Sequence, residues 1–266
     1  MSAARVAAII PARMASSRFP GKSLLRVRNL PMVEHVRRRT LCCKRFSEVV
    51  VATCDREIAE VVEGYGGRCI MTSPAHPAAT DRVAEAARSL DCTHVVNVQG
   101  DEILVLPNDL ERMVNAITEE PHVPAWNAVA RIENASELGD SSIVKSILST
   151  SGRILYCARN LSALAPHLGG AHEPIRRILG ILAYRRDFLE QYGRLTRTPL
   201  EQAEAIDQLR ILEHDVMLRA VAFSRGYPGI NESREVTTVT TLLEQDATQQ
   251  ILLQEISGPS YADEQS

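Results

Sequence analysis

The chain has 266 residues, of which 45% are hydrophobic and 24% are charged, and its formal net charge is −3. This length and composition are typical of a globular protein that buries one sizeable core. The small negative charge provides no global basic field for nucleic acid, and no apolar stretch reaches the roughly 18 residues of a membrane span, so we predict a cytoplasmic protein.

Apolar runs of strand length recur along the chain, and helical patterns separate many of them. The predicted strands cover residues 6–10, 49–53, 69–72, 95–99, 125–132, 144–148, 178–184 and 218–223. The predicted helices cover residues 31–41, 57–65, 81–90, 109–118, 200–213 and 235–253. Because strands and helices alternate through the first half, we predict an α/β fold with a mainly parallel, Rossmann-like nucleotide-binding sheet and helices on both faces.

The same pattern predicts a single domain over residues 1–256. Prolines and glycines interrupt the regular pattern between residues 119 and 199, which indicates an inserted or dimerisation subdomain. Residues 257–266 combine Gly, Pro and acidic residues, so we expect a disordered tail there.

A basic loop follows the first predicted strand. The apolar run over residues 6–10 ends at Pro11, and the next residues include Arg13, Arg18 and Lys22. A buried strand that ends in such a loop presents backbone N–H groups and three positive charges to one anionic group, as a polyphosphate requires. Taken alone, these residues are equally compatible with a solvated basic loop.

Three consecutive arginines, at positions 37–39, lie within the helical pattern that follows this loop. We interpret this run as a solvated helix face. The cysteines show neither a C-x-x-C pair nor a metal-like spacing, so we predict reduced thiols in the core. They are Cys42, Cys43, Cys54, Cys69, Cys92 and Cys157.

Polar residues also follow the predicted strand over residues 95–99. Gln99 ends this strand, and Asp101 follows it after one glycine. Ligands of open α/β folds bind at the carboxyl ends of parallel strands, and Mg²⁺ favours one or two carboxylates plus phosphate oxygens, so Asp101 is a candidate metal ligand. An ordinary Gly-Asp turn explains the residues equally simply. Thr80 is a candidate N-cap for the helix that carries Arg82.

The segment over residues 9–23 resembles, nearly residue for residue, the N-terminal signature of the 3-deoxy-manno-octulosonate (Kdo) cytidylyltransferases. It is more distantly similar to that of the sialic acid cytidylyltransferases. The resemblance continues to about residue 243. It implies a nucleotide-diphospho-sugar transferase-like fold, CTP and an anionic sugar acid as substrates, Mg²⁺ as cofactor and a homodimer. The implied reaction is transfer of CMP from CTP to Kdo or a related 3-deoxy-2-ulosonic acid, with release of pyrophosphate, in lipopolysaccharide biosynthesis.

The resemblance also implies roles for individual residues. The implied nucleotide-binding residues are Arg13, Ser16, Arg18, Lys22, Ala79, Arg82 and Gln99. Among them, the segment that ends at Arg82 would lie against the cytosine, and Arg82 would read the base. The implied catalytic residues are Arg13, Lys22 and Asp101. The implied metal ligands are Asp101 and Asn231, and the implied acceptor-binding residues are Lys145, Arg159, Asp207 and Gln208. No side chain is an obvious general base, and His76 is a candidate by position only.

The chain departs from the family pattern at the acceptor positions. Ile178 and Leu182 stand where the family typically has His and Tyr, and Asp207 stands where it usually has Glu. These replacements would leave Kdo hydroxyl groups without partners in the site. Each unpaired buried polar group would cost about 1–3 kcal/mol of binding free energy. The identity of the acceptor therefore stays open.

The nucleotide and metal positions show two further departures. Ala78 and Ala79 replace a Ser-Gly pair of the family. The added Cβ atom of Ala79 would hinder close approach of the backbone to the base. Asn231 replaces an Asp, which removes a full charge from the implied metal site, and the adjacent Glu232 is a candidate to compensate.

Two other classes of function are alternatives. A sugar-nucleotide-dependent glycosyltransferase also uses an acidic motif at a strand end, but it does not need a basic triphosphate loop. A non-catalytic relative would bind CTP without turnover. Release of pyrophosphate, release of a nucleoside diphosphate, or binding alone would separate the three.

Overall fold

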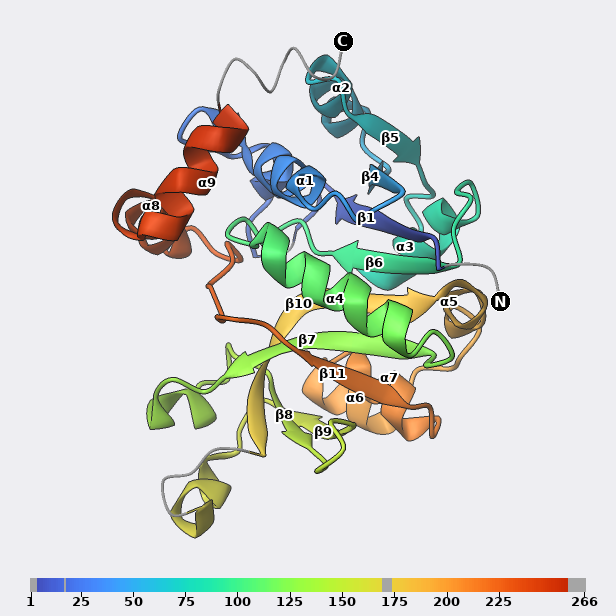
Figure 1. Cartoon of the computed structure of the whole chain (residues 1–266), viewed down its shortest axis with the longest axis vertical. Coiled ribbons are helices and arrows are strands. Elements are labelled where there is room, and N and C mark those ends of the chain that lie inside the picture. The colour runs from blue at the N-terminus through green and yellow to red at the C-terminus, as the bar shows by residue number, and fades with distance from the viewer. Residues whose placement is uncertain (1–3, 17, 169–173, 258–266) are drawn as a thin grey trace. The chain divides into compact units, whose positions relative to one another are not determined.

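The computed structural model describes residues 4–16, 18–168 and 174–257. The chain divides into two compact units (Figure 1). The first unit comprises Met1–Val114 and Tyr227–Ser266, and the second is Asn115–Gly226. The subdomain predicted over residues 119–199 falls within the sequence range of the second unit. Of the predicted tail, residues 258–266 lie outside the described residues.

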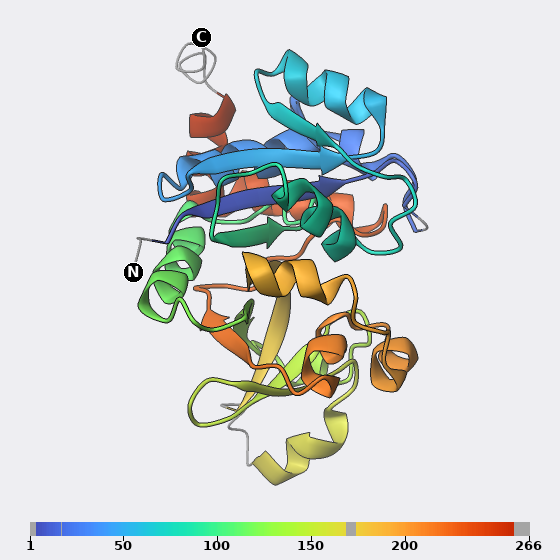
Figure 2. The same ribbon diagram turned by 90° about the vertical axis from the view of Figure 1, so that its right-hand side faces the viewer.

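The first unit contains a parallel sheet in the order β6-β1-β4-β5. Its strands are β1 (Val6–Ala12), β4 (Glu48–Thr53), β5 (Arg68–Met71) and β6 (His94–Val98). Figure 2 shows β1 and β4, in two shades of blue, pointing the same way. All residues of β1 and β6 are buried, which explains why they read as continuous apolar runs. The predicted parallel sheet is confirmed.

Three helices of this unit alternate with its strands, and two more follow each other near its C-terminal end. They are α1 (Met32–Cys42), α2 (Arg56–Gly64), α3 (Ala79–Ala87), α8 (Glu235–Gln245) and α9 (Ala247–Ser257). The connection from β1 to β4 and that from β5 to β6 run in opposite directions along the sheet. Right-handed crossovers therefore place α1 and α3 on opposite faces, as predicted. Helix α4 (Pro107–Glu119) begins in the first unit, and a two-stranded sheet of β2 (Arg26–Val27) and β3 (Leu30–Pro31) precedes α1.

The second unit contains a mixed sheet. Its strands are β7 (Ala125–Arg131), β8 (Lys145–Leu148), β9 (Ile154–Ala158), β10 (Ile175–Arg185) and β11 (Leu218–Ala222). Strand β10 pairs antiparallel with β7 and β8, β8 pairs antiparallel with β9, and β11 is parallel to β7. The helices are α5 (Arg186–Tyr192), α6 (Pro199–Glu204) and α7 (Gln208–Glu213). The sequence analysis did not predict β9 or α5.

The single helix predicted over residues 200–213 is wrong, because α6 ends before α7 begins. Ala205 adopts a left-handed conformation with φ of 53° and forms the C-cap of α6. The Arg159 side chain donates hydrogen bonds to the carbonyl oxygens of Glu204 (2.8 Å) and Ala205 (3.2 Å). Arg159, the residue directly after β9, thus satisfies two carbonyl groups at the end of α6 and supports the end of the helix.

The helix predicted over residues 235–253 is likewise two helices, α8 and α9. Asp246 separates them in an extended conformation. Its carboxylate accepts hydrogen bonds from the backbone N–H groups of Thr248 (3.0 Å) and Gln249 (3.1 Å). Asp246 is thus an N-cap for α9, and a capped helix start interrupts an otherwise continuous apolar pattern.

The interpretation of residues 37–39 as a solvated helix face is wrong. Arg37, Arg38 and Arg39 are 2%, 9% and 0% exposed. The reason is Glu34, which is fully buried one turn earlier on α1 and accepts hydrogen bonds from both Arg37 and Arg38. Arg39 donates instead to the side-chain oxygen of Gln249 at 2.7 Å, and burial lowers the pKa of Arg39 to about 10.

The cysteines are free thiols, as predicted. Cys43, Cys92 and Cys157 are buried, whereas the other three are only partly buried. Burial raises the pKa of Cys157 to about 12, so this thiol stays protonated at neutral pH. Within the described residues, no helix combines the length and the apolar character needed to cross a membrane.

Candidate active site

A pocket in the first unit opens at the carboxyl ends of β1 and β6. Every residue that the sequence analysis assigned to the nucleotide or the metal lines this pocket. The lining residues are Pro11, Ala12, Arg13, Ser16, Arg18, Lys22, Ser23, His76, Ala78, Ala79, Arg82, Gln99, Gly100, Asp101 and Asn231. Parallel strands bring their carboxyl ends to one edge of the sheet, which explains how segments distant in sequence meet here.

The basic loop after β1 is held in shape by its own backbone. The carbonyl oxygen of Met14 accepts hydrogen bonds from the N–H groups of Ser16 and Gly21, each at 2.9 Å. Gly21 has φ of 75°, a conformation that favours glycine. The Ser23 hydroxyl donates to the carbonyl oxygen of Arg13 at 3.1 Å. The loop therefore presents its cations from a closed, hydrogen-bonded turn.

Two cations of this loop already contact the predicted metal-binding residues. The Lys22 Nζ atom lies 3.0 Å from Asp101 Oδ2, and both side chains are less than one-fifth exposed. Lys22 Nζ also donates to the carbonyl oxygen of Ile230 at 3.0 Å. Arg18 donates to Asn231 Oδ1 at 3.2 Å. The pocket thus pairs each oxygen ligand with a positive charge.

Glycine permits two close backbone approaches around Asp101. A Cβ atom on Gly100 would lie 2.9 Å from the carbonyl oxygen of Pro11, and one on Gly229 would lie 2.7 Å from the carbonyl oxygen of Asp101. Both distances are too short for real Cβ contacts, so these positions need glycine. The Asp101 backbone is consequently packed between β1 and the segment that leads to Asn231.

The wall formed by α3 and its preceding loop holds Arg82 and His76. Arg82 is 3% exposed and donates hydrogen bonds to the Thr72 hydroxyl and, at 3.4 Å, to the Cys54 thiol. His76 Nε2 bonds to the Glu85 carboxylate, which also accepts the backbone N–H of Ser73 at 2.9 Å. The loop over residues 73–76 is thereby tied to α3.

The predicted N-cap role of Thr80 is wrong. Helix α3 begins at Ala79, and Ala78 occupies the N-cap position without a side-chain hydrogen bond. Thr80 lies in the first turn and is 3% exposed. Because Ala78 has no side-chain acceptor, the first N–H groups of α3 have no side-chain cap at the point where the helix borders the pocket.

The pocket does not form a metal centre from protein ligands alone. Across the parts of the chain that the structure describes, no group of three or more His, Cys, Asp or Glu side chains could hold a metal ion. Asp101 supplies one carboxylate and Asn231 one amide oxygen. This donor set suits a divalent metal ion that takes phosphate oxygens as further ligands.

The predicted acceptor-binding residues lie in the second unit, where Lys145 and Arg159 already have partners. Lys145 is fully buried, and its Nζ donates to the carbonyl oxygens of Asp140 and Ile143, both at 2.7 Å, and of Arg159. Desolvation lowers the pKa of Lys145. Arg159 donates to the main chain at the end of α6. Their predicted contact with the acceptor stays a prediction.

Gln208 belongs to a second buried polar group. It is 8% exposed, and its Nε2 donates to Asn127 Oδ1 at 2.8 Å. Asn127 in turn donates to the carbonyl oxygen of Leu179 at 3.0 Å, within β10, where a register shift occurs between Ile178 and Leu182. Asn127 was not predicted from the sequence, because a single Asn in an apolar strand gives no pattern.

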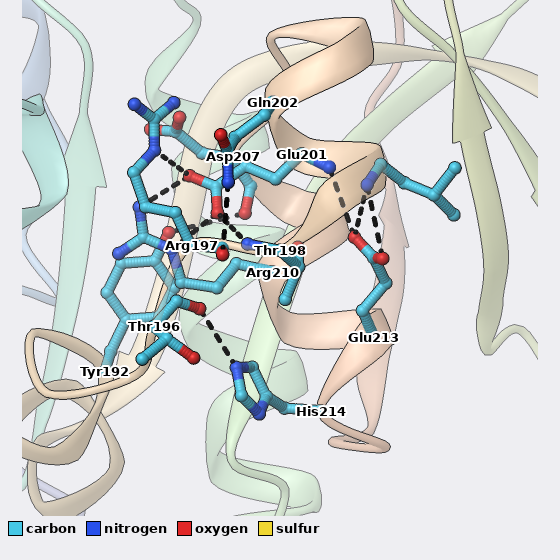
Figure 3. A network of polar contacts seen from close by, with 11 residues as sticks. Tyr192, Thr196, Arg197, Thr198, Glu201, Gln202, Asp207, Arg210, Glu213 and His214 are labelled. Atoms are coloured by element: carbon cyan, nitrogen blue, oxygen red, sulfur yellow. Dashed lines mark hydrogen bonds and ion pairs between the residues drawn. The ribbon is translucent and has the colours of Figure 1, made fainter.

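Asp207 neighbours a buried ion pair, shown in Figure 3. Glu201 is fully buried and accepts hydrogen bonds from Arg210 Nε at 2.9 Å, Arg210 Nη2 at 2.5 Å and Arg197 Nε at 3.1 Å. Burial alone would raise the pKa of Glu201, but these hydrogen bonds, together with one from the Thr198 backbone, outweigh it and lower the pKa. The pair joins α6 to α7 around the Asp207 position.

Comparisons with known proteins agree along the chain. A family model described as cytidylyltransferase matches residues 7–218. The 3-deoxy-manno-octulosonate cytidylyltransferase of Myxococcus xanthus is 40% identical over 246 residues, covering 91% of this chain and 98% of that protein. The enzyme of the same name from Escherichia coli is 34% identical over 239 residues, covering 90% of this chain and 96% of that protein.

Solved structures are similar as well. A structure of CMP:2-keto-3-deoxy-manno-octonic acid synthetase complexed with CTP has a TM-score of 0.85 and 33% identity, covering 91% of this chain and 99% of that chain. The 4-diphosphocytidyl-2C-methyl-D-erythritol synthase of Anaerococcus prevotii has a TM-score of 0.62 at 12% identity, covering 91% of this chain and 99% of that chain. The latter similarity concerns the fold alone.

Proposed function

This chain belongs to the 3-deoxy-manno-octulosonate cytidylyltransferase family, and we propose that it transfers CMP from CTP to Kdo or a related 3-deoxy-2-ulosonic acid. The observation that carries the proposal is the pocket at the ends of β1 and β6. It combines three cations from one loop with Asp101 and Arg82. A triphosphate needs such a concentration of positive charge beside a single metal-binding carboxylate.

In the proposed reaction, the anomeric hydroxyl of the sugar acid attacks the α-phosphorus of CTP. A new P–O bond forms, the bond between the α-phosphorus and the oxygen that bridges it to the β-phosphorus breaks, and pyrophosphate leaves with that oxygen. The hydroxyl proton is released to solvent. Arg13, Arg18 and Lys22 hold the triphosphate and neutralise the departing pyrophosphate, while Gln99 and Arg82 bind the nucleoside. Such a site acts mainly by positioning its substrates and by compensating charge.

We further propose Mg²⁺ as the divalent metal. Asp101 would hold it together with phosphate oxygens, with Asn231 as a neutral ligand, and the ion would stabilise charge on the reacting phosphate. Lys22 Nζ lies 3.0 Å from Asp101 Oδ2, and we expect it to turn to the phosphates when the nucleotide binds.

Turnover of CTP with a panel of sugar acids tests the proposal. We expect pyrophosphate release that depends on CTP and on a 3-deoxy-2-ulosonic acid, with Kdo as the first acceptor to test. Release of CDP from a CDP-linked donor would instead support a glycosyltransferase. Binding of CTP without turnover by any acceptor would support a non-catalytic relative.

The first prediction concerns nucleotide choice. We expect CTP to stabilise the protein more than ATP at equal concentration, because Arg82 is fixed by Thr72 and Cys54 on the wall assigned to the base. Thermal-shift titration measures this difference, since ligand stabilisation follows RT ln(1 + [L]/Kd). Equal stabilisation by both nucleotides would contradict the assignment of Arg82 to cytosine.

The second prediction concerns Asn231. Asn231→Asp should lower the Mg²⁺ concentration for half-maximal turnover by about tenfold, because a second carboxylate strengthens the attraction for a divalent cation. The measurement is a Mg²⁺ titration of turnover at saturating CTP. Glu232→Gln tests the adjacent carboxylate, and we expect it to leave the titration unchanged, because Glu232 pairs with Arg234 at 3.0 Å. If neither variant changes the titration, the metal is held elsewhere; if only Glu232→Gln raises the Mg²⁺ requirement, Glu232 already supplies the second charge.

The third prediction is a homodimer. The irregular segment in the second unit is longer than a plain crossover needs, and Leu155 on β9 is 53% exposed. Multi-angle light scattering at micromolar concentration should report twice the chain mass of 29.3 kDa. A monomer under these conditions would contradict the prediction.

A further inference from the structure

Asp55 occupies the N-cap position of α2 without capping it. Its backbone carbonyl oxygen accepts hydrogen bonds from the N–H groups of Ile58 (3.1 Å) and Ala59 (3.2 Å), so the helix starts at this residue. An Asp at this position ordinarily accepts a first-turn N–H with its side chain as well. Here the carboxylate makes no such bond. The start of α2 therefore does not explain where this side chain points.

The Asp55 carboxylate instead contacts the basic loop that follows β1. Its Oδ2 atom accepts the backbone N–H of Met14 at 2.8 Å. The same Met14 residue accepts the N–H groups of Ser16 and Gly21 with its carbonyl oxygen. Met14 is thus the point at which both halves of the loop are joined, and Asp55 holds it from outside the pocket lining.

Asp55 is itself firmly placed. Its backbone N–H donates to the Thr53 hydroxyl at 3.1 Å, and Thr53 is the last residue of β4, in register with Ala12 of β1. The turn between β4 and α2 also reaches Arg82, because the Cys54 thiol lies 3.5 Å from Asp55 Oδ2 and 3.4 Å from the Arg82 guanidinium. The turn between β4 and α2 therefore contacts both the basic loop and Arg82, the residue assigned to the base.

We propose that Asp55 is a positioning residue for CTP binding, which acts through the Met14 N–H and does not touch the nucleotide. This inference rests on the proposed function. A loop already fixed in its binding shape does not lose conformational freedom when the triphosphate binds, so CTP binds more tightly. Without the carboxylate, the Met14 N–H loses its partner, and the loop must be ordered by the ligand.

Titration calorimetry with CTP and Mg²⁺ tests the role of Asp55. Asp55→Ala should raise the Kd for CTP at least tenfold, while Asp55→Asn should stay within about threefold, because its amide oxygen still accepts the Met14 N–H. Asp55→Ser keeps a residue that favours the start of α2 but shortens the side chain, and it should weaken CTP binding like the Ala variant. In steady-state kinetics, the KM for CTP should rise and the KM for the acceptor should not.

Asp246→Ala is the matched control. Asp246 caps α9 through Thr248 and Gln249, outside the pocket, so its loss should lower thermal stability and leave the Kd for CTP unchanged. Wild-type affinity in Asp55→Ala and Asp55→Ser would overturn the inference, as would equal losses in Asp55→Asn and Asp55→Ala. The wild-type protein is titrated first. If the wild-type protein does not bind CTP, the proposed function fails, and the role of Asp55 in CTP binding fails with it.

Discussion

Asp101→Asn should reduce turnover at least about 1,000-fold, because a metal ion contributes several kcal/mol to the transition state and each 1.36 kcal/mol is a factor of ten. Asp101 supplies the single carboxylate among the described pocket-lining residues. The substitution also removes the charge that faces Lys22 Nζ at 3.0 Å. Turnover is measured as pyrophosphate release at saturating CTP, and Mg²⁺ is raised to test for rescue.

Asp91→Asn is the control for this substitution. Asp91 is 79% exposed and pairs with Arg5 on the surface, so the same chemical change should leave turnover within about twofold. Asp101→Asn should retain a cooperative thermal transition, because it keeps the size of the side chain. Turnover within tenfold of the wild-type protein would show that the metal is held by other groups, and the pocket would need a different mechanism.

The sequence placed the residues assigned to the nucleotide and the metal in one pocket because these residues stand beside strong local signals. Arg13 directly follows β1, Lys22 lies farther along the same loop, and Asp101 lies three residues after the end of β6. The carboxyl ends of parallel strands must meet at one edge of the sheet. The positioning role proposed for Asp55 was not predicted. An Asp before a helix indicates an N-cap, and only the structure shows that its carboxylate turns to Met14 instead.

The buried arginines on α1 show what a charge pattern leaves undetermined. Three consecutive arginines read as a solvated face, but Glu34 lies one turn earlier and pairs with two of them in the core. To predict that Arg39 is buried, one would have to know that α9 packs on this helix, where Gln249 accepts a hydrogen bond from Arg39. A long-range contact of this kind has no local sequence pattern.

The partners of Lys145 and Arg159 could not be predicted from the sequence. The resemblance assigned Lys145 and Arg159 to the sugar acid, and in the structure both side chains donate to main-chain carbonyl groups. Backbone carbonyl groups carry no residue identity, so no sequence motif reveals such partners. We expect Arg159 at least to shape the turn at Glu204 and Ala205, and Lys145 to fix the main chain at Asp140, Ile143 and Arg159, whatever the acceptor is.

The second large effect is expected at Glu201. Glu201→Gln should lower the free energy of unfolding of the second unit by about 3–5 kcal/mol, because it removes the buried carboxylate that accepts two hydrogen bonds from the guanidinium of Arg210, which is only 5% exposed. The lowered pKa of Glu201 gives the pH dependence. A carboxylate with a depressed pKa stabilises the fold above the ordinary value of about 4.5, and this contribution is lost as the pH falls below it.

Urea unfolding followed by circular dichroism measures this effect for Glu201→Gln and for two comparison variants. Glu190→Gln breaks an exposed pair with Arg186 in the same unit and should cost less than about 1 kcal/mol. Glu201→Gln combined with Arg210→Met removes both charges, and it should be less destabilised than the single variant, because no buried cation remains that has lost its carboxylate. If the single and double variants unfold at the same urea concentration, the loss in Glu201→Gln comes from packing between α6 and α7 rather than from the loss of the ion pair.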